Sequence, residues 1–262
     1  MASRIYQVDA FTDTLFGGNP AAVCPLDSWP SDALMQNIAQ ENNLSETAFY
    51  LKDSNGYHIR WFTPEVEVDL CGHATLAAAY VLFNHEKHDK DIIHFHSARS
   101  GDLKVTRRAD WLTLDFPADE LIELKLTDKL YKGFNIKPKS VYKGKTDYLF
   151  VFETESDIIN LKPDFIEIGK LDCRGIIVTA RGTATDFVSR FFTPQCGINE
   201  DPVTGSAHTT LTPYWTKVLN KSQLTAKQVS ARGGYLKCKL LDDRVKISGQ
   251  AKLYMVGEIS FS

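Results

Sequence analysis

The sequence has few cysteines, no strongly basic segment and no long apolar run. Its five cysteines are scattered and contain no C-x-x-C pair, which argues against a zinc site and a disulfide framework and favours reduced thiols. No run approaches the ~18 apolar residues of a membrane span, and the N-terminus has no signal-peptide pattern. The net charge of −3 comes without a basic stripe, so the footprint of a nucleic-acid-binding protein is missing. We therefore expect a cytoplasmic protein that binds neither nucleic acid nor membrane.

Signatures of cofactor and metal sites are also missing. No G-x-G-x-x-G motif or phosphate-binding loop occurs, so no nucleotide cofactor is predicted. The spaced pairs His94/His96 and His85/His88 could supply metal ligands, but no third ligand follows at a suitable spacing. We interpret them as solvent-facing histidines and predict no metal site.

What the sequence does contain is a long-range internal repeat. The segment RWFTP at 60–64 recurs as RFFTP at 190–194, an offset of 130 residues. The segment SARSG at 97–101 recurs as SARGG at 230–234, an offset of 133 residues. Two matches in order with nearly equal offsets favour a duplication, and a period of half the chain is too long for a solenoid. We therefore expect two domains of one architecture.

Apolar periodicity and turn residues predict the elements of each half. In the first half we expect helices at 32–42, with Ser31 as N-cap, and at 73–83, with one apolar face, and strands at 6–11, 21–24, 47–52, 57–62, 92–96, 103–106 and 111–116. In the second half we expect helices at 163–169 and 207–219 and strands at 148–152, 175–180, 187–192, 229–231, 236–240, 245–248 and 255–261.

These elements predict an α+β fold of two pseudo-symmetric domains, each a mixed β-sheet wrapped around a central helix. The first domain would span 1–117, with 252–262 crossing back to it, and the second would span 118–251. We interpret 117–139 as the link between them.

A small-residue loop precedes each central helix, at 69–75 and at 200–207. A helix N-terminus attracts carboxylates through unpaired N–H groups and its dipole, and Gly72 and Gly205 allow a ligand to approach the backbone. We expect the two helix starts to face one cleft and hold a small anionic substrate there. An ordinary helix start remains the alternative for either loop alone.

Polar residues lie at the same points of the sequence. His73 opens a helix, where the dipole would lower its pKa and keep the ring neutral for proton transfer; a capping or surface histidine is the alternative. Asp201 is a capping acid or a site acid. Glu46 is an ordinary turn glutamate or, held in a cleft, a general base. The turn containing Asn19 is a plain hairpin loop or a ligand contact.

Taken together, these motifs resemble the PhzF-like family, which is named for the isomerase of phenazine biosynthesis. The resemblance spans nearly the whole chain, and it is carried by GNP at 18–20, NLSETAF at 43–49, DLCGHAT at 69–75 and EDPVTGSAH at 200–208. It implies a diaminopimelate epimerase-like fold of two similar domains, commonly a homodimer, with no cofactor and no metal.

The resemblance also implies roles for single residues. Glu46 corresponds to the glutamate that moves a proton between carbons of a dihydro-hydroxyanthranilate-type substrate, with His73 and Asp201 lining the site. We expect the substrate to contact a set of small and polar residues, namely Asn19, Gly72, Thr204, Gly205 and Ser206.

Two other functions stay open. Related racemases and epimerases of this fold use two cysteines as opposed bases; Cys71 occupies the first place, but the second motif has Asp201-Pro202 and no cysteine. An amino-acid racemase would therefore need Cys71 together with a different base. The remaining alternative is a non-catalytic protein that kept the cleft for binding small molecules.

Overall fold

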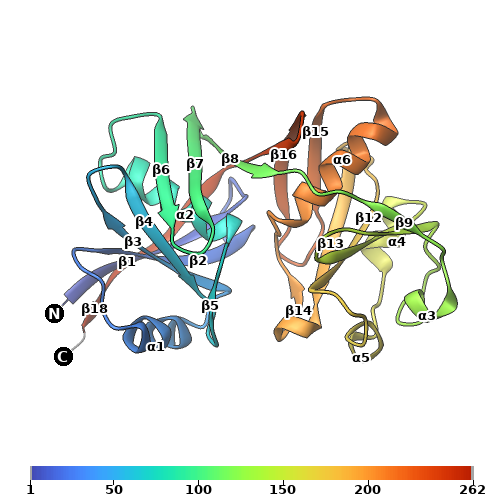
Figure 1. Cartoon of the computed structure of the whole chain (residues 1–262), viewed down its shortest axis with the longest axis horizontal. Helices are drawn as coiled ribbons and strands as arrows, with labels where there is room; N and C mark the ends of the chain where they lie inside the picture. Colours follow the sequence, from blue (N-terminus) through green and yellow to red (C-terminus); the bar gives the residue numbers. More distant parts are fainter. Residues whose placement is uncertain (1, 261–262) are drawn as a thin grey trace. The chain divides into compact units, whose positions relative to one another are not determined.

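A computed structural model describes residues 2–260, which form two compact units (Figure 1). Unit 1 comprises residues 2–115 and 248–260, and unit 2 comprises residues 116–247. The chain enters unit 2 within strand β8 (Trp111–Pro117) and leaves it within strand β17 (Arg244–Gly249). The sequence predicts domain boundaries at 117/118 and 251/252, and these boundaries stay a prediction. Within residues 2–260, no helix has the length and apolar character needed to cross a membrane.

Unit 1 contains two helices and a curved mixed sheet. Its helices are α1 (Asp32–Asn42) and α2 (Gly72–Asn84). Besides β8, its strands are β1 (Ala2–Ala10), β2 (Asn19–Leu26), β3 (Glu46–Lys52), β4 (Tyr57–Phe62), β5 (Glu67–Val68), β6 (Ile92–Ser97), β7 (Gly101–Arg108) and β18 (Ala251–Ser260). Ser31 accepts a hydrogen bond from Leu34 N, which confirms it as the N-cap of α1.

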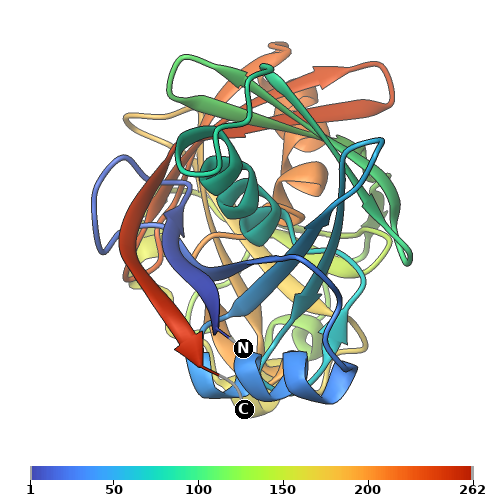
Figure 2. The same cartoon turned by 90° about the vertical axis from the view of Figure 1, so that its left-hand side faces the viewer.

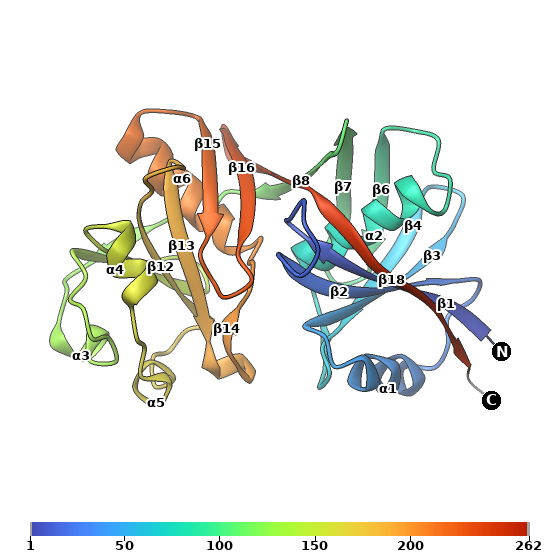
Figure 3. The same ribbon diagram turned by 180° about the vertical axis from the view of Figure 1, so that it is seen from behind.

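The sheet of unit 1 surrounds helix α2. Strand β2 pairs parallel with β3, β3 antiparallel with β4, and β4 parallel with β6. Strand β18 pairs antiparallel with β1, as Figure 3 shows. Helix α2 contacts β1, β2, β3 and β18 and lies among these strands in Figure 2. The prediction of one apolar face for this helix was wrong, because Leu76, Ala79 and Phe83 are buried as well; a helix enclosed by a sheet is apolar all round.

Unit 2 contains one long helix, α6 (Ala207–Leu219), and several shorter ones. These are α3 (Asp128–Tyr131), α4 (Glu155–Asn160), α5 (Phe165–Ile168) and a 3₁₀ turn (Pro194–Cys196). Besides β17, its strands are β9 (Ile122–Leu124), β10 (Ser140–Lys143), β11 (Asp147–Val151), β12 (Gly175–Arg181), β13 (Phe187–Thr193), β14 (Ile198–Asp201), β15 (Gln223–Gln228) and β16 (Gly234–Leu241).

Strand pairing in unit 2 follows the same order as in unit 1. Strand β11 pairs parallel with β12, β12 antiparallel with β13, and β13 parallel with β15. The short strand β14 pairs antiparallel with β13, as β5 does with β4. Both units are therefore mixed sheets with few helices, as the predicted α+β class requires.

The repeated sequence motifs make matching contacts in the two units. Arg60 binds both carboxylate oxygens of Glu67, at 2.7 and 2.9 Å. Arg190, its counterpart in the second RxFTP motif, binds both carboxylate oxygens of Glu200, at 2.8 and 2.9 Å. Each bidentate pair ties the strand that carries the motif to the short strand leading toward the central helix.

The second motif holds the loop before the central helix. Ser100 Oγ donates to the carbonyl of Asp69 at 2.5 Å in unit 1. In unit 2 the serine that donates is Ser230, at the first position of the motif instead of the fourth, and its Oγ donates to the carbonyl of Pro202 at 2.7 Å. Both sequence repeats therefore act on the segment where each central helix begins.

Two further sequence predictions differ from the structure, and a third lies partly outside the described residues. The strand expected at 229–231 was wrong: β15 ends at Gln228, and Gly233, with φ +66°, closes a turn by donating to Ser230 Oγ. The segment 117–139 is not a link, because β9 pairs with β10 and the residues Leu124, Leu126 and Leu130 pack on the core of unit 2. The end of the strand expected at 255–261 lies outside the described residues.

Candidate active site

The predicted site residues lie at the central-helix starts of the two units. Unit 1 holds Asn19, Glu46, Gly72 and His73, and unit 2 holds Asp201, Thr204, Gly205 and Ser206. The expectation that the two helix starts share one cleft stays a prediction.

Strand pairing positions the residues of unit 1. Strands β2 and β3 run parallel, and Glu46, the first residue of β3, pairs with Ala21 near the start of β2. Asn19 begins β2 and is buried. His73 occupies the first turn of α2, which packs against both strands. Three side chains far apart in the sequence are thus brought to one place.

The His73 ring is in contact with three neighbouring side chains. Its Nε2 atom lies 3.1 Å from Oε2 of Glu46. Its Nδ1 atom lies 3.2 Å from Nδ2 of Asn19 and 3.4 Å from Sγ of Cys71. Ser45 Oγ donates to Oδ1 of Asn19 at 3.1 Å, which fixes the amide behind the ring. His73 is held on one side and presents its other nitrogen to the carboxylate.

The predicted lowering of the His73 pKa was wrong. Burial by itself lowers the pKa of this histidine, but its interactions with Cys71 and with the Glu46 carboxylate outweigh burial and raise the pKa well above its ordinary value. A carboxylate 3.1 Å away favours the imidazolium more than the helix dipole disfavours it.

Cys71 is the N-cap of α2 and is buried beside His73. Burial raises the pKa of its thiol to about 11, with the Glu46 charge adding to that effect. The thiol is therefore uncharged at neutral pH and is a poor base or nucleophile there. Glu46 consequently provides the negative charge that the His73 imidazolium faces.

The same residues carry atoms of the kinds that ligate metal ions. Glu46, Cys71 and His73 each offer one ligand atom, and these atoms lie within 4.8 Å of one another. Sulfur, imidazole and carboxylate donors suit zinc, but binding would require loss of a thiol proton whose pKa burial raises to about 11. The expectation of no metal stays a prediction.

In unit 2 a buried glutamine fixes the loop that contains Asp201. Gln228 Nε2 donates to the carbonyl of Asp201 at 2.7 Å, and its Oε1 accepts from Thr204 N at 2.9 Å. Thr204 Oγ1 donates to Oδ2 of Asp201. Asp201, Thr204 and Gln228 are all buried. The backbone N–H of Thr204 already donates to Gln228 and is therefore not available to bind a substrate. Thr204 instead helps to shape the loop.

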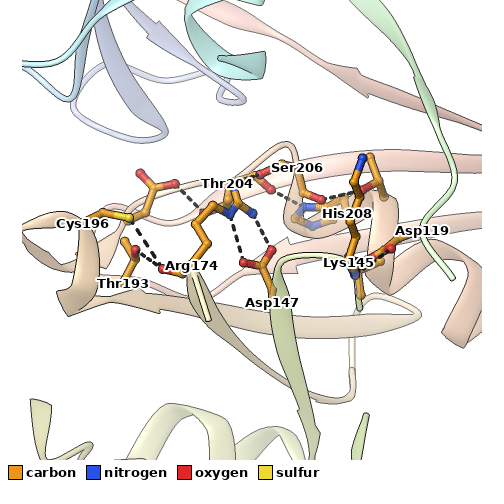
Figure 4. A network of polar contacts seen from close by, with 12 residues as sticks. Asp119, Lys145, Asp147, Arg174, Thr193, Cys196, Thr204, Ser206 and His208 are labelled. Carbon is orange, nitrogen blue, oxygen red and sulfur yellow. Dashed lines mark hydrogen bonds and ion pairs between the residues drawn. The ribbon is translucent and has the colours of Figure 1, made fainter. Parts of the chain in front are cut away.

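A second polar network reaches the start of α6 (Figure 4). Arg174 donates through Nε and Nη2 to the two carboxylate oxygens of Asp147. Its Nη1 donates to Ser206 Oγ at 3.0 Å. Ser206 is the N-cap residue of α6 but makes no side-chain cap hydrogen bond. Its hydroxyl is therefore directed to the arginine.

Sequence reasoning missed several of these residues. Ser45 belongs to a quoted motif but was not singled out, whereas Arg174, Asp147 and Gln228 lie in none. Arg174 and Gln228 meet the start of α6 only through strand pairing, and no local spacing in the sequence reveals that. The aromatic residue of the second RxFTP motif offered one signal, because Arg174 stacks over Phe191.

Comparison with known proteins shows similarity over the whole chain. A family model described as phenazine biosynthesis-like protein, PhzC-PhzF, matches residues 8–257. An uncharacterized isomerase of Pseudomonas aeruginosa is 52% identical, with 99% of each chain covered. The crystal structure of a PhzF-family phenazine biosynthesis protein from Enterococcus faecalis is 48% identical, with a TM-score of 0.97 and 100% of each chain covered. A predicted epimerase of Pseudomonas aeruginosa shares the fold, with 21% identity, a TM-score of 0.80, and 99% and 100% of the two chains covered.

Proposed function

The chain belongs to the PhzC-PhzF family of phenazine biosynthesis-like proteins and is an isomerase, and from this premise we propose that it moves a proton between two carbon atoms of a small carboxylic acid. Glu46 removes the proton from one carbon and returns it to another. The protein needs no cofactor for this reaction, because the substrate's own double bond shifts as the proton moves. The family resemblance supports a dihydro-hydroxyanthranilate as the substrate class.

The contact between Glu46 Oε2 and His73 Nε2 carries this proposal. The carboxylate side chain is 18% exposed and the histidine behind it is 6% exposed, so only the glutamate of this pair is accessible to a substrate. The Oε2 atom is buried against His73 Nε2, so a substrate would meet the remaining, exposed part of the side chain. A carboxylate held ionised in this way is available as a general base in a substrate complex.

The His73 imidazolium supports both halves of the transfer. In the first half a C–H bond breaks, its proton goes to the Glu46 carboxylate, and the electron pair enters the substrate π-system. In the second half the proton of the Glu46 carboxylic acid forms a bond to a different carbon. The Nε2–H of the ring donates to Glu46 and keeps the resting glutamate ionised, and Asn19 and Cys71 lie beside the Nδ1 atom of the ring. Asn19 on this account positions His73 rather than contacting the substrate.

Residues of unit 2, and Gly72 of unit 1, are assigned to substrate binding. Asp201 provides an acidic group on a loop that Gln228 holds rigidly. Gly72, Gly205 and Ser206 lie at helix starts without side-chain caps, where backbone amides favour a carboxylate or a developing negative charge. The working form on this proposal is a homodimer, as is common in the family.

We also propose that the two units are pseudo-symmetric copies of a diaminopimelate epimerase-like domain. The matching order of strand pairing supports this. So do the equivalent arginine–glutamate pairs of the two RxFTP motifs. Duplication would explain why sequence repeats and contact repeats coincide.

The test is turnover and binding by a Glu46→Gln variant. Glutamine keeps the size of the side chain but cannot accept the proton, so turnover of a dihydro-hydroxyanthranilate should fall about 10³-fold or more, while ligand affinity changes only a few-fold. The matched control is Glu41→Gln, which changes an exposed glutamate of α1 and should leave both quantities unaltered. Full turnover by the Glu46→Gln variant would refute the assignment.

A further inference from the structure

Arg174 occupies the position in unit 2 that Ser45 occupies in unit 1. Glu46 is the first residue of β3 and pairs across parallel strands with β2. Gly175 is the first residue of β12 and pairs across parallel strands with β11. Each of these residues therefore begins the second strand of the parallel pair, at the same step of the pairing order in its unit. The residue before each is Ser45 in unit 1 and Arg174 in unit 2.

Unit 2 cannot hold a carboxylate at the place where unit 1 has Glu46. A Cβ atom added to Gly175 would lie 2.2 Å from the Phe191 ring, and this ring lies on the adjacent strand β13. The steric block leaves the side chain of Arg174 as the charged group at this strand start. Where unit 1 offers a proton acceptor, unit 2 offers a guanidinium.

We propose that Arg174 is a substrate-binding residue that selects for an anionic group, a carboxylate above all, and positions Ser206 beside it. The proposal rests on the proposed function, since it names the chemical group by which that substrate is recognised. Three of the five guanidinium N–H donors are engaged, two by Asp147 and one by Ser206 Oγ. The two others, one each on Nη1 and Nη2, remain to donate to an anionic group such as a carboxylate.

The burial of the two charges shows which of them is directed outward. The Asp147 side chain is 2% exposed, whereas that of Arg174 is 39% exposed. The buried carboxylate and the Phe191 ring fix the guanidinium from behind, and the exposed part remains accessible to a ligand. A cation held in one orientation loses little side-chain entropy when it binds, which favours specificity for a small acid.

The pair of probes for the test is 3-hydroxyanthranilate and 2-aminophenol, which differ only in the carboxylate. Their dissociation constants would be measured by calorimetry for the wild type, for Arg174→Lys and for the double variant Arg174→Gln/Asp147→Asn. The double variant removes both charges at once and so avoids leaving a buried carboxylate unpaired. Arg107→Gln, an arginine paired with Asp91 in unit 1, is the matched control, and thermal melting verifies that each variant is folded.

The wild type should bind 3-hydroxyanthranilate about tenfold or more tighter than 2-aminophenol. The double variant should lose that preference through weaker binding of the carboxylate probe alone, Arg174→Lys should keep part of it, and Arg107→Gln should keep all of it. A folded double variant that retains the preference overturns the proposal, and so does a wild type that does not bind 3-hydroxyanthranilate. The dissociation constants are measured without turnover. They would therefore be the same even if Glu46 did not transfer a proton.

Discussion

The Nε2 atom of His73 lies 3.1 Å from Oε2 of Glu46, and this contact helps to raise the pKa of the histidine. The pKa of His73 is raised well above 6.5 because its interactions with Cys71 and Glu46 together outweigh burial. A histidine whose pKa is higher in the folded than in the unfolded state stabilises the fold most below the unfolded value, near pH 6.5. That contribution is lost as the pH rises through the folded pKa.

Replacing His73 by glutamine should therefore cost most stability at low pH. The difference in free energy of unfolding between the wild type and His73→Gln is expected to be largest below pH 6.5 and to shrink as the pH rises through the folded-state pKa of His73. Urea denaturation at a series of pH values measures it. His94→Gln, which changes an exposed histidine, should show no such dependence. A difference that grows with pH would contradict the charged state assigned here.

A Cys71→Ala variant should keep the activity, because its thiol is buried and uncharged at neutral pH. We expect turnover within about tenfold of the wild type, since the loss affects only the packing of His73. In the native protein at pH 7, iodoacetamide should modify the exposed Cys196 well before Cys71, as peptide mass spectrometry would detect. Rapid alkylation of Cys71 with loss of activity would instead favour the two-base racemase.

Much of the site could be predicted because its motifs are contiguous. The segments around Glu46, His73 and Asp201 each combine a helix or strand start with a polar residue, and local patterns record such starts well. Arg174 and Gln228 have no such pattern, since their partners lie 32 and 24 residues away in the sequence, at Ser206 and Thr204. Only the parallel pairing of strands brings them to α6.

The charge of His73 could not be predicted for a related reason. Its position at a helix start was correct, but the helix dipole is a weaker influence than a carboxylate in direct contact. The sequence places Glu46 27 residues earlier, so the contact was invisible before the fold was known. The segment 117–139 was likewise interpreted as a link, although its apolar residues pack on the core of unit 2.

The Arg174–Asp147 pair should be important for stability because one of its charges is buried. Arg174→Met should lower the free energy of unfolding by about 3–5 kcal/mol, since it leaves the Asp147 carboxylate without its partner. The double variant Arg174→Met/Asp147→Leu should recover most of that loss. Lys139→Met, which breaks an exposed pair with Glu153, should cost under about 1 kcal/mol. Equal losses in the single and double Arg174 variants, measured by denaturation, would argue against this pairing.

His208 should make the protein sensitive to mild acid. Burial lowers the pKa of this histidine to about 4, and its Nδ1 atom is hydrogen-bonded to the carbonyl of Thr204 at 2.8 Å. Between pH 6.5 and about 4 the unfolded chain binds a proton there that the folded protein does not. The free energy of unfolding should thus fall by up to about 3 kcal/mol across that window. In His208→Gln the fall in the free energy of unfolding with acid should be smaller by that amount. If this variant shows the same pH dependence of stability as the wild type, the ring of His208 is not neutral and buried.

The most direct measurement of proton transfer by Glu46 is the fate of solvent deuterium. A dihydro-hydroxyanthranilate would be incubated with the wild type and with Glu46→Gln in D₂O, and product and recovered substrate would be analysed by NMR. The account predicts deuterium at the carbon that receives the proton in the wild-type product, and neither product nor deuterium with Glu46→Gln. Deuterium incorporation by Glu46→Gln at the wild-type rate would contradict it.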